Sequence, residues 1–323
     1  MSVGGGGEDQ NCLGLFAQRM IRQKNIPLCD IYHFHPPQIS FIRHTFVLSL
    51  ITNSGWTCSS PFFYNGEMSL LIASWNVNSI KARMGHLLTW LDAFRPDIVL
   101  LQETKCTEET FPHLDLETTP YNVSVVGEKS YNGVAVLSKA PIEVLCRSLT
   151  GQTQARYLEV LTAGVKVASV YVPNGEDLTS PKFVNKMAFF DALQTRMQSM
   201  LDDGLPVIVG GDFNVAFDPI DVYDPKHFKN RLLFSDEERR KFRTLIHHGY
   251  QDALRLKHPD AVLYSWWDYR AGRYDRNEGV RIDYLLTSSQ ATDRLVDAGI
   301  DRTPRGLEKP SDHTPVWIRL GGV

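Results

Sequence analysis

The sequence of 323 residues lacks closely spaced cysteines. It has five, none of them in a C-x-x-C pair: Cys12, Cys29, Cys58, Cys106 and Cys146. Zinc sites and disulfide frameworks need cysteines at short, regular spacings, so neither kind of site is indicated. We therefore expect a protein of a reducing compartment.

Long hydrophobic runs and an excess of one charge are also missing. The longest apolar run near the N-terminus, FVLSLI at 46–51, is far shorter than the roughly 20 residues that span a bilayer, and no basic secretory region precedes it. The formal net charge is −3, so any binding of nucleic acid must rely on locally clustered basic residues. We expect a soluble, cytoplasmic protein without a membrane partner.

Residues 1–67 differ from the rest of the chain. They begin with GGGG, hold three of the five cysteines and show no sustained period of two or 3.6 residues. We predict a poorly structured N-terminal extension and favour a mis-assigned start, with a targeting extension or a tail as alternatives. A strand pattern begins at Met68, and residues 68–323 have the length of one large α/β domain.

The pattern of residues 68–323 predicts many strands and few long helices. The strand-like runs are LLIASWNV, DIVLLQET, YNVSVV, GVAVLSK, RYLEVLT, VKVASVYV, VIVGGDFN, RIDYLLTS and TPVWIRL. Apolar residues from Ile80 to Leu91 share one helical face before Pro96, and Ser235 with Glu238 forms a capping box for another helix. This pattern favours an α/β protein with two packed sheets and helices outside them.

Several predicted strands end on polar side chains. In IVGGDFNVAF, Asp212 and Asn214 follow a buried run, and on an extended segment they would face the same side. The other polar residues of this kind are Asn76, Glu103, Tyr171, Asp283, Asp312 and His313. Each alone could be a turn former, a cap or a core residue with its polar group satisfied. Together they indicate one site at a shared rim of the sheets.

Eight motifs occur in the order typical of the exonuclease III family of AP endonucleases, within the endonuclease/exonuclease/phosphatase superfamily. They are SWNVNSI, PDIVLLQETK, NGVAVLSK, YVPNG, GDFNVA, SWWDYR, RIDYLL and SDHTPVW. GDFN and SDH mark only the superfamily, whereas LQETK, and SWWDYR followed by RID, are more specific. The chain thus resembles this family over residues 68–323.

The resemblance implies a fold and an activity. The fold would be a four-layered α/β sandwich, in which two packed β-sheets are flanked by helices. The activity would be metal-dependent hydrolysis of the phosphodiester 5′ to abasic sites in double-stranded DNA. The family also implies 3′-to-5′ exonuclease activity and the cleaning of blocked 3′ ends.

The resemblance implies a site for Mg²⁺ or Mn²⁺. Glu103 would be the principal ligand, because these ions prefer carboxylate oxygens together with substrate phosphate. Asn76 would hold the metal shell or Asp212 in place, and Asp312 would reach the metal or its water. Asn78 stands where animal relatives carry an Asp, so the site resembles the bacterial branch and is less charged.

The same resemblance assigns catalytic roles. Asp212 would activate water or handle the proton of the leaving group, and Asn214 would orient the same water. Asp283 would pair with His313, fix the tautomer of its ring and keep it cationic enough to bind a phosphate oxygen.

Contacts to DNA are expected from several further residues. Tyr171 and Asn174 would donate hydrogen bonds to the phosphate, and Arg156 would lie along the DNA strand. Lys226 and Lys229, in the segment DPKHFKNRLLF, would grip phosphates, although a charge run is more often a solvated face.

The two tryptophans of SWWDYR receive different roles. Trp267 would line the pocket for the abasic sugar, because the family discriminates by flipping out a residue that has no base. Trp266 would belong to the core.

Two other functions stay open. A superfamily relative could act on another phosphoester, as a ribonuclease or phosphatase does, but SWWDYR argues against it. A non-catalytic nucleic-acid-binding module could have kept the fold, but the intact set of polar residues argues against such decay. We expect a monomer.

Overall fold

The structure is a computed structural model, and it describes residues 69–322. The predicted extension at 1–67 lies outside the described residues. Within them, all nine predicted strands are confirmed, and three further strands appear that the sequence did not indicate. In this part of the chain no helix has the length and apolar character that crossing a membrane requires.

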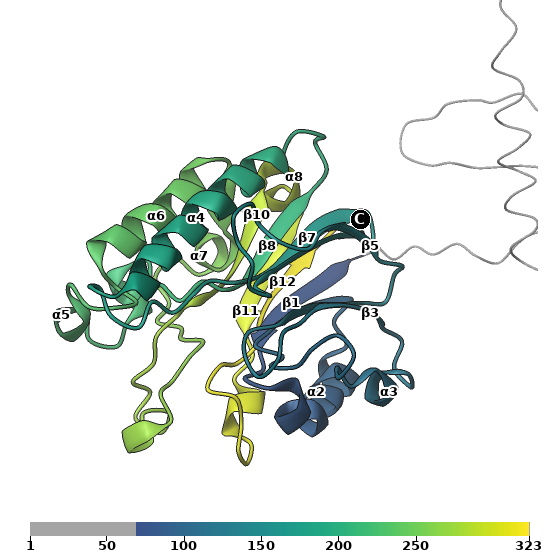
Figure 1. Ribbon diagram of the computed structural model, residues 1–323, viewed down its shortest axis with the longest axis horizontal. Helices are drawn as coiled ribbons and strands as arrows, with labels where there is room; N and C mark the ends of the chain where they lie inside the picture. Colours follow the sequence, from purple (N-terminus) through teal and green to yellow (C-terminus); the bar gives the residue numbers. More distant parts are fainter. Residues whose placement is uncertain (1–68, 323) are drawn as a thin grey trace, which may run out of the picture. The chain divides into compact units, whose positions relative to one another are not determined.

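Two six-stranded sheets form the centre of the described fold (Figure 1). The first has the order β11-β12-β1-β2-β4-β3, with bounds Leu295–Ile300, Val316–Leu320, Leu70–Asn76, Ile98–Gln102, Val134–Ser138 and Asn122–Val126. The second has the order β5-β6-β7-β8-β10-β9, with bounds Glu143–Cys146, Tyr157–Thr162, Val165–Tyr171, Val207–Asp212, Asp283–Ser288 and Tyr250–Asp252. In each of these sheets the two middle strands are parallel, β1 with β2 and β7 with β8, and the other neighbours are antiparallel.

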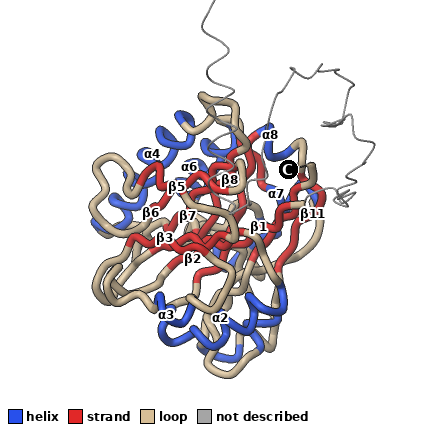
Figure 2. Tube along the Cα trace, turned by 90° about the vertical axis from the view of Figure 1, so that its right-hand side faces the viewer, coloured by secondary structure: helices blue, strands red, loops and turns tan. Residues whose placement is uncertain are grey.

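Helices cover the outer face of each sheet. Helices α2 (Ile80–Phe94) and α3 (His113–Leu116) pack on the first sheet, and α4 (Pro181–Ser199) and α6 (Asp236–His247) pack on the second. Figure 2 shows the strands of both sheets between these two helix layers. The predicted four-layered α/β sandwich is therefore confirmed. Shorter helices are α5 (Pro225–Phe228), α7 (Ala253–Lys257) and α8 (Ser289–Thr292), and 3₁₀ turns lie at Pro219–Asp221, Arg270–Gly272 and Thr303–Gly306.

The layers follow from the alternation of side chains along each strand. On β1, Ile72 is buried between the sheets, whereas Ala73 and Trp75 face α2. Helix α2 ends as predicted before Pro96, and its C-cap residue Arg95 is left-handed with φ 53°. The capping box of Ser235 and Glu238 is present at the start of α6.

Candidate active site

The predicted polar residues meet at one rim of the two sheets. Asn76 ends β1, and Glu103 follows β2, its parallel neighbour. In the second sheet, Asp212 at the end of β8 lies beside Tyr171 on β7 and Asp283 on β10. Strands that end at the same edge thus bring together side chains from distant parts of the sequence.

The two glycines before Asp212 allow this close approach. A Cβ on Gly210 would lie 2.5 Å from the end of the Leu285 side chain and 2.7 Å from that of Leu100, so a larger residue would displace both leucines. A Cβ on Gly211 would lie 1.8 Å from the carbonyl oxygen of Val170 on β7. Glycine at 211 is therefore required by the backbone packing directly behind the site.

The amide of Asn76 connects two carboxylates. Its Nδ2 donates to Glu103 Oε1 at 2.9 Å and to Asp212 Oδ2 at 3.0 Å, while its Oδ1 accepts from the backbone N–H of Asn78 at 3.0 Å. The NH₂ group therefore orients both carboxylates, which fits the expected role of holding Glu103 and Asp212 in place. The amide oxygen has a second lone pair, and the assignment of Asn76 to the metal shell remains a prediction.

The side chains of Asp212 and Asn214 do face each other, but not for the predicted reason. The strand ends at Asp212, and Asn214 is left-handed with φ 49°, so the segment is not extended. Asp212 Oδ1 accepts from the Asn214 backbone N–H at 2.9 Å, and Asn214 Nδ2 lies 3.3 Å from Asp212 Oδ2. This Asx turn, rather than strand alternation, aligns the pair.

His313 joins the two buried aspartates. Its Nδ1 lies 2.9 Å from Asp283 Oδ2, so the expected contact between these residues is present. Its Nε2 points toward Asp212 Oδ2 at 3.6 Å. Ser265 also donates to Asp283 Oδ2, at 2.6 Å, and fixes the carboxylate from the other side. Ser265 was missed as a site residue, although the motif SWWDYR begins with it.

The pKa values of Asp212 and His313 depend on each other and on the charge of Asp283. Burial raises the pKa of Asp212 to about 7, with Asp283 and Glu103 adding to the rise and His313 opposing it. Burial lowers the pKa of His313, but the charges of Asp283 and Asp212 outweigh it and raise that pKa to about 10. A carboxyl group that titrates near neutral pH beside an imidazolium can accept or deliver a proton in catalysis.

Among the described residues, one group of three or more His, Cys, Asp or Glu side chains lies close enough to share a metal ion. Atoms of Glu103, Asp212 and His313 are within 4.8 Å of one another. In the metal-free protein His313 bonds Asp283 through Nδ1, and its raised pKa keeps a proton on Nε2. The oxygen ligands that this group offers are the carboxylates of Glu103 and Asp212.

Glu103 has the properties of a hard cation ligand. Burial raises its pKa, but Lys105 and the amide of Asn76 reverse this effect, so the net pKa is lowered and the carboxylate stays ionised. Lys105 Nζ lies 2.8 Å from Glu103 Oε2 and 2.6 Å from Asn78 Oδ1. Lys105 was missed as a site residue, although the motif LQETK contains it.

Asp312 lies on the other side of Asn78. Its Oδ1 accepts from Asn78 Nδ2 at 2.8 Å, and its Oδ2 accepts from Trp266 Nε1 at 2.9 Å. Burial raises its pKa, but His313 and these two hydrogen bonds lower it overall. Ionised oxygen donors from Glu103 and Asp312 at one rim match the chemistry that Mg²⁺ and Mn²⁺ require.

The burial expected for the two tryptophans is the reverse of what the structure shows. Trp267 has no exposed surface and packs on Tyr274 with its ring centroid 5.2 Å away, so it is a core residue and cannot line an open pocket. Trp266 is partly exposed, borders the cluster of Val280 and Ile282, and reaches Asp312. Adjacent residues of an extended segment point to opposite sides, and the sequence does not reveal which side is the core.

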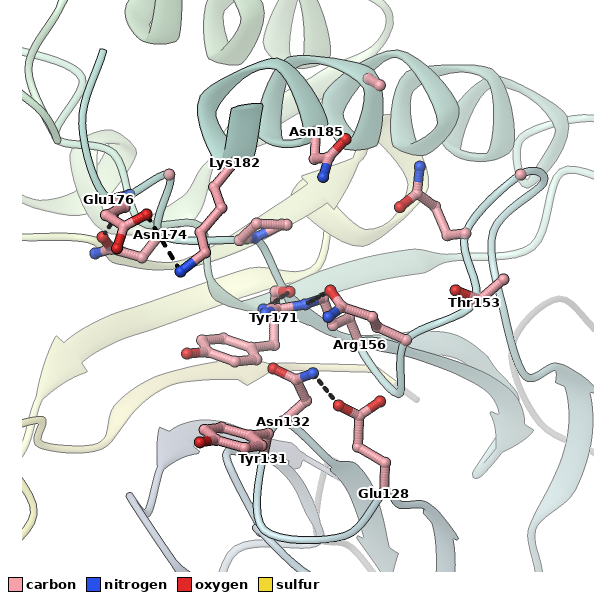
Figure 3. A pocket seen from close by; sticks show the side chains of 16 residues that line it. Glu128, Tyr131, Asn132, Thr153, Arg156, Tyr171, Asn174, Glu176, Lys182 and Asn185 are labelled. Atoms are coloured by element: carbon pink, nitrogen blue, oxygen red, sulfur yellow. Dashed lines mark hydrogen bonds and ion pairs between the residues drawn. The ribbon is translucent and has the colours of Figure 1, made fainter. Parts of the chain in front are cut away.

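A polar groove of about 1020 Å³ opens beside this rim. Tyr171, Asn174 and Arg156 line it, and the Arg156 guanidinium stacks over the Tyr171 ring at 4.5 Å. Figure 3 shows Lys182 and Asn185 projecting from α4 on one side of the groove. The groove therefore offers cationic and amide donors next to the carboxylates.

The basic segment lies apart from this groove. Lys226 and Lys229 are exposed at α5 and just after it, and neither lines the groove. Asn174 is exposed as well, and its Nδ2 donates to Asn214 Oδ1 at 3.1 Å, which ties it to the catalytic rim.

Comparison with known proteins identifies the family. A family model described as the Endonuclease/Exonuclease/phosphatase family matches residues 73–313. The chain belongs to this family. An exodeoxyribonuclease III of Haemophilus influenzae is 32% identical over 262 residues, which cover 76% of this chain and 98% of the relative.

Solved structures of family members share the fold. A 3′ phosphatase, NExo, from Neisseria, bound to a product DNA hairpin, has a TM-score of 0.76 and is 35% identical, with 78% of this chain and 99% of that chain covered. An AP endonuclease from Archaeoglobus fulgidus has a TM-score of 0.76 and is 35% identical, and the match covers 79% of this chain and 100% of that chain. The family thus includes enzymes that hydrolyse phosphoesters of DNA.

Proposed function

We propose that this protein is a DNA repair nuclease that hydrolyses the phosphodiester 5′ to abasic sites in double-stranded DNA. We include 3′-to-5′ exonuclease activity and removal of blocks from 3′ ends in the proposal. The observation that carries it is the buried contact of Asp212 with Asn76, Asn214 and His313 at the rim of the sheets. Family relatives named as an exodeoxyribonuclease III, a 3′ phosphatase and an AP endonuclease support the same reaction class.

Asp212 is the group proposed to take the proton from the attacking water. With a pKa of about 7, it is available as a base at neutral pH, and Asn76 and Asn214 hold its Oδ2 in place. Its carboxylate would then be protonated as the new oxygen–phosphorus bond forms and the bond from phosphorus to the 3′ oxygen breaks on the opposite side. The departing 3′ oxygen would take a proton from solvent, and Asp212 would release its proton to solvent. In its alternative role, Asp212 would instead protonate the departing 3′ oxygen.

His313 is proposed to stabilise the phosphate. Its Nε2–H, next to Asp212, would donate to a non-bridging oxygen, on which negative charge increases in the transition state. Asp283 and Ser265 hold the ring from behind, so the donor is oriented before substrate arrives. Tyr171 and Asn174 would add donors from the groove.

Glu103 and Asp312 are the residues proposed to hold Mg²⁺ or Mn²⁺, with Lys105 and Asn78 orienting them. The bound ion would supply Lewis-acid stabilisation of the phosphoryl oxygens. The backbone of Glu103 is left-handed, with φ 51°, an uncommon conformation for a glutamate that is typical of constrained functional sites.

Substrate recognition is proposed along two surfaces. Arg156 would contact the DNA strand in the groove, while Lys226 and Lys229 would bind phosphates from their exposed segment. Trp266 takes the place of Trp267 as the residue proposed to line the pocket for the abasic sugar, since it is partly exposed and touches Asp312. A monomeric state and a cytoplasmic location remain predictions from the sequence.

Incision of a duplex with one abasic site tests the proposal directly. The expected product is a nick on the 5′ side that leaves a 3′ hydroxyl, formed with Mg²⁺ and abolished by EDTA. Cleavage of phosphoinositides or RNA in place of abasic DNA would indicate a superfamily relative with another substrate. Binding without cleavage at any metal concentration would indicate a non-catalytic module.

A further inference from the structure

A lysine with no exposed surface lies behind the catalytic rim. Lys186, on α4, and Glu238, on α6, both have side chains that are 0% exposed, and they form an ion pair. Burial lowers the pKa of Lys186, while Glu238 opposes this shift. A buried ion pair often contributes little to stability compared with apolar residues, because both charges lose their hydration. The pair therefore needs an explanation other than fold stability.

The ammonium group of Lys186 is fully used. Its three hydrogen bonds go to Glu238 Oε1, to the carbonyl oxygen of Asn214 at 2.6 Å and to the carbonyl oxygen of Asn174 at 3.1 Å. Those two asparagines also bond each other through their side chains at 3.1 Å. One buried cation thus fixes the backbone of two loops, which follow β7 and β8, directly behind the groups that face the reaction.

Glu238 extends the connection to a third segment. Its carboxylate accepts from the backbone N–H groups of Leu233 and Ser235, at 3.1 and 3.0 Å, beyond its bond to Lys186. The carbonyl of Leu233 in turn accepts from the N–H of Ala216, two residues after Asn214. The ion pair of Lys186 and Glu238 therefore holds the Asn214 loop at two points: Lys186 bonds the carbonyl of Asn214 directly, and Glu238 holds Leu233, which bonds Ala216.

We propose that Lys186, anchored by Glu238, is a positioning residue that sets the orientation of Asn214 and Asn174 toward the scissile phosphate. In the left-handed conformation of Asn214, its carbonyl oxygen turns inward to Lys186 while its side chain reaches Asp212, so the bond to Lys186 fixes the peptide from which that side chain projects. The proposal rests on the nuclease function proposed above.

The test compares two substitutions on α4. Lys186→Met keeps most of the side-chain volume and removes the donors, whereas Arg196→Met removes a bidentate bond to buried Glu159 that does not reach the rim. We expect Lys186→Met to lower kcat on abasic duplex at least about 10-fold with Kd within about 3-fold, and Arg196→Met to leave kcat within about 2-fold. Both are assayed well below their melting temperatures.

A double-mutant cycle separates positioning from general damage. If Lys186 acts through Asn214, Lys186→Met should lower kcat much less in an Asn214→Ala background than alone. Equal losses in both backgrounds, or a normal kcat for Lys186→Met, would overturn the proposal. If Lys186→Met does not fold, the uncharged pair Lys186→Met/Glu238→Gln takes its place in the same cycle.

Hydrogen exchange provides a measurement that does not depend on activity. Amides at 172, 174–176 and 212–216 should exchange faster in the Lys186 variant than in wild type, and should be unchanged in Arg196→Met. Unchanged exchange at both loops would overturn the positioning role. If wild type fails to incise abasic DNA, the proposed function is wrong, and the exchange comparison alone then decides whether Lys186 holds these loops.

Discussion

The Nε2 atom of His313 lies 3.6 Å from Oδ2 of Asp212, and both side chains are almost fully buried. Burial disfavours the charged form of each group, yet the imidazolium and the carboxylate stabilise each other, and Asp283 adds a second negative charge behind the ring. The Asp212 carboxylate, which can accept a proton, and the His313 imidazolium, which can bind an anion, are therefore close enough to contact the same phosphate.

His313 should remain protonated in the metal-free protein up to about pH 10. This pKa lies above the ordinary value of 6.5, so the folded state favours the imidazolium; its stabilising effect is complete below pH 6.5 and is lost as the pH rises through about 10. Nitrogen-15 NMR of the ring measures the charge directly. Asp283→Asn should lower this pKa, and a neutral ring at pH 8 in wild type would contradict the assignment.

Glu103→Gln should lower incision by orders of magnitude and increase the Mg²⁺ concentration needed for half-maximal rate. The substitution preserves size but removes a ligand charge. A metal titration of the incision rate measures both effects. A normal rate across that titration would show that Glu103 is not a ligand.

Asp212→Asn should greatly reduce kcat while DNA binding stays within about a few-fold, because the carboxylate acts mainly in the transition state. Single-turnover incision and fluorescence anisotropy separate the two quantities. His313→Ala should likewise reduce kcat greatly while DNA binding stays within about a few-fold. Parallel losses of rate and affinity would contradict the catalytic roles.

The adjacent tryptophans should respond differently to alanine. Trp267→Ala removes a fully buried ring and should cost about 3–5 kcal/mol of unfolding free energy. Trp266→Ala should affect stability less but reduce the preference for abasic over intact duplex. Denaturant unfolding and competition between the two duplexes measure these effects. A larger loss of stability for Trp266→Ala and a larger loss of abasic preference for Trp267→Ala would instead place Trp267 in the pocket and Trp266 in the core.

A protein that starts at Met68 should keep its incision rate and its melting temperature. Every site residue proposed here lies between Asn76 and His313, and the hydrophobic clusters of the described chain begin at Leu70. A packed extension would bury apolar surface worth roughly 25 cal/mol per Å², so its removal would be measurable. A fall of many degrees, or lost incision, would place 1–67 in the fold.

Most of the architecture could be predicted from the sequence because the signal for a central strand is local. Runs such as DIVLLQ are apolar on both faces, as expected of strands covered on both sides, and each was located. The strands β5, β9 and β11 were missed. Each lies at the edge of its sheet and includes polar residues such as Glu143, Gln251 and Asp297, so its strand character comes from pairing with a neighbour.

The residues of the site could also be located from the local sequence, since Asp212, Glu103 and His313 each lie at or beside the end of a strand pattern. What only the tertiary structure decided is how these groups are used. The bond from Asn76 to Asp212 spans 136 residues, and it shows that the amide orients this carboxylate. The sequence likewise does not show that Trp266 rather than Trp267 is exposed, or that Lys186 supports Asn214. Hydrogen-bond direction and burial depend on which distant segments pack together, and a local pattern carries no record of that packing.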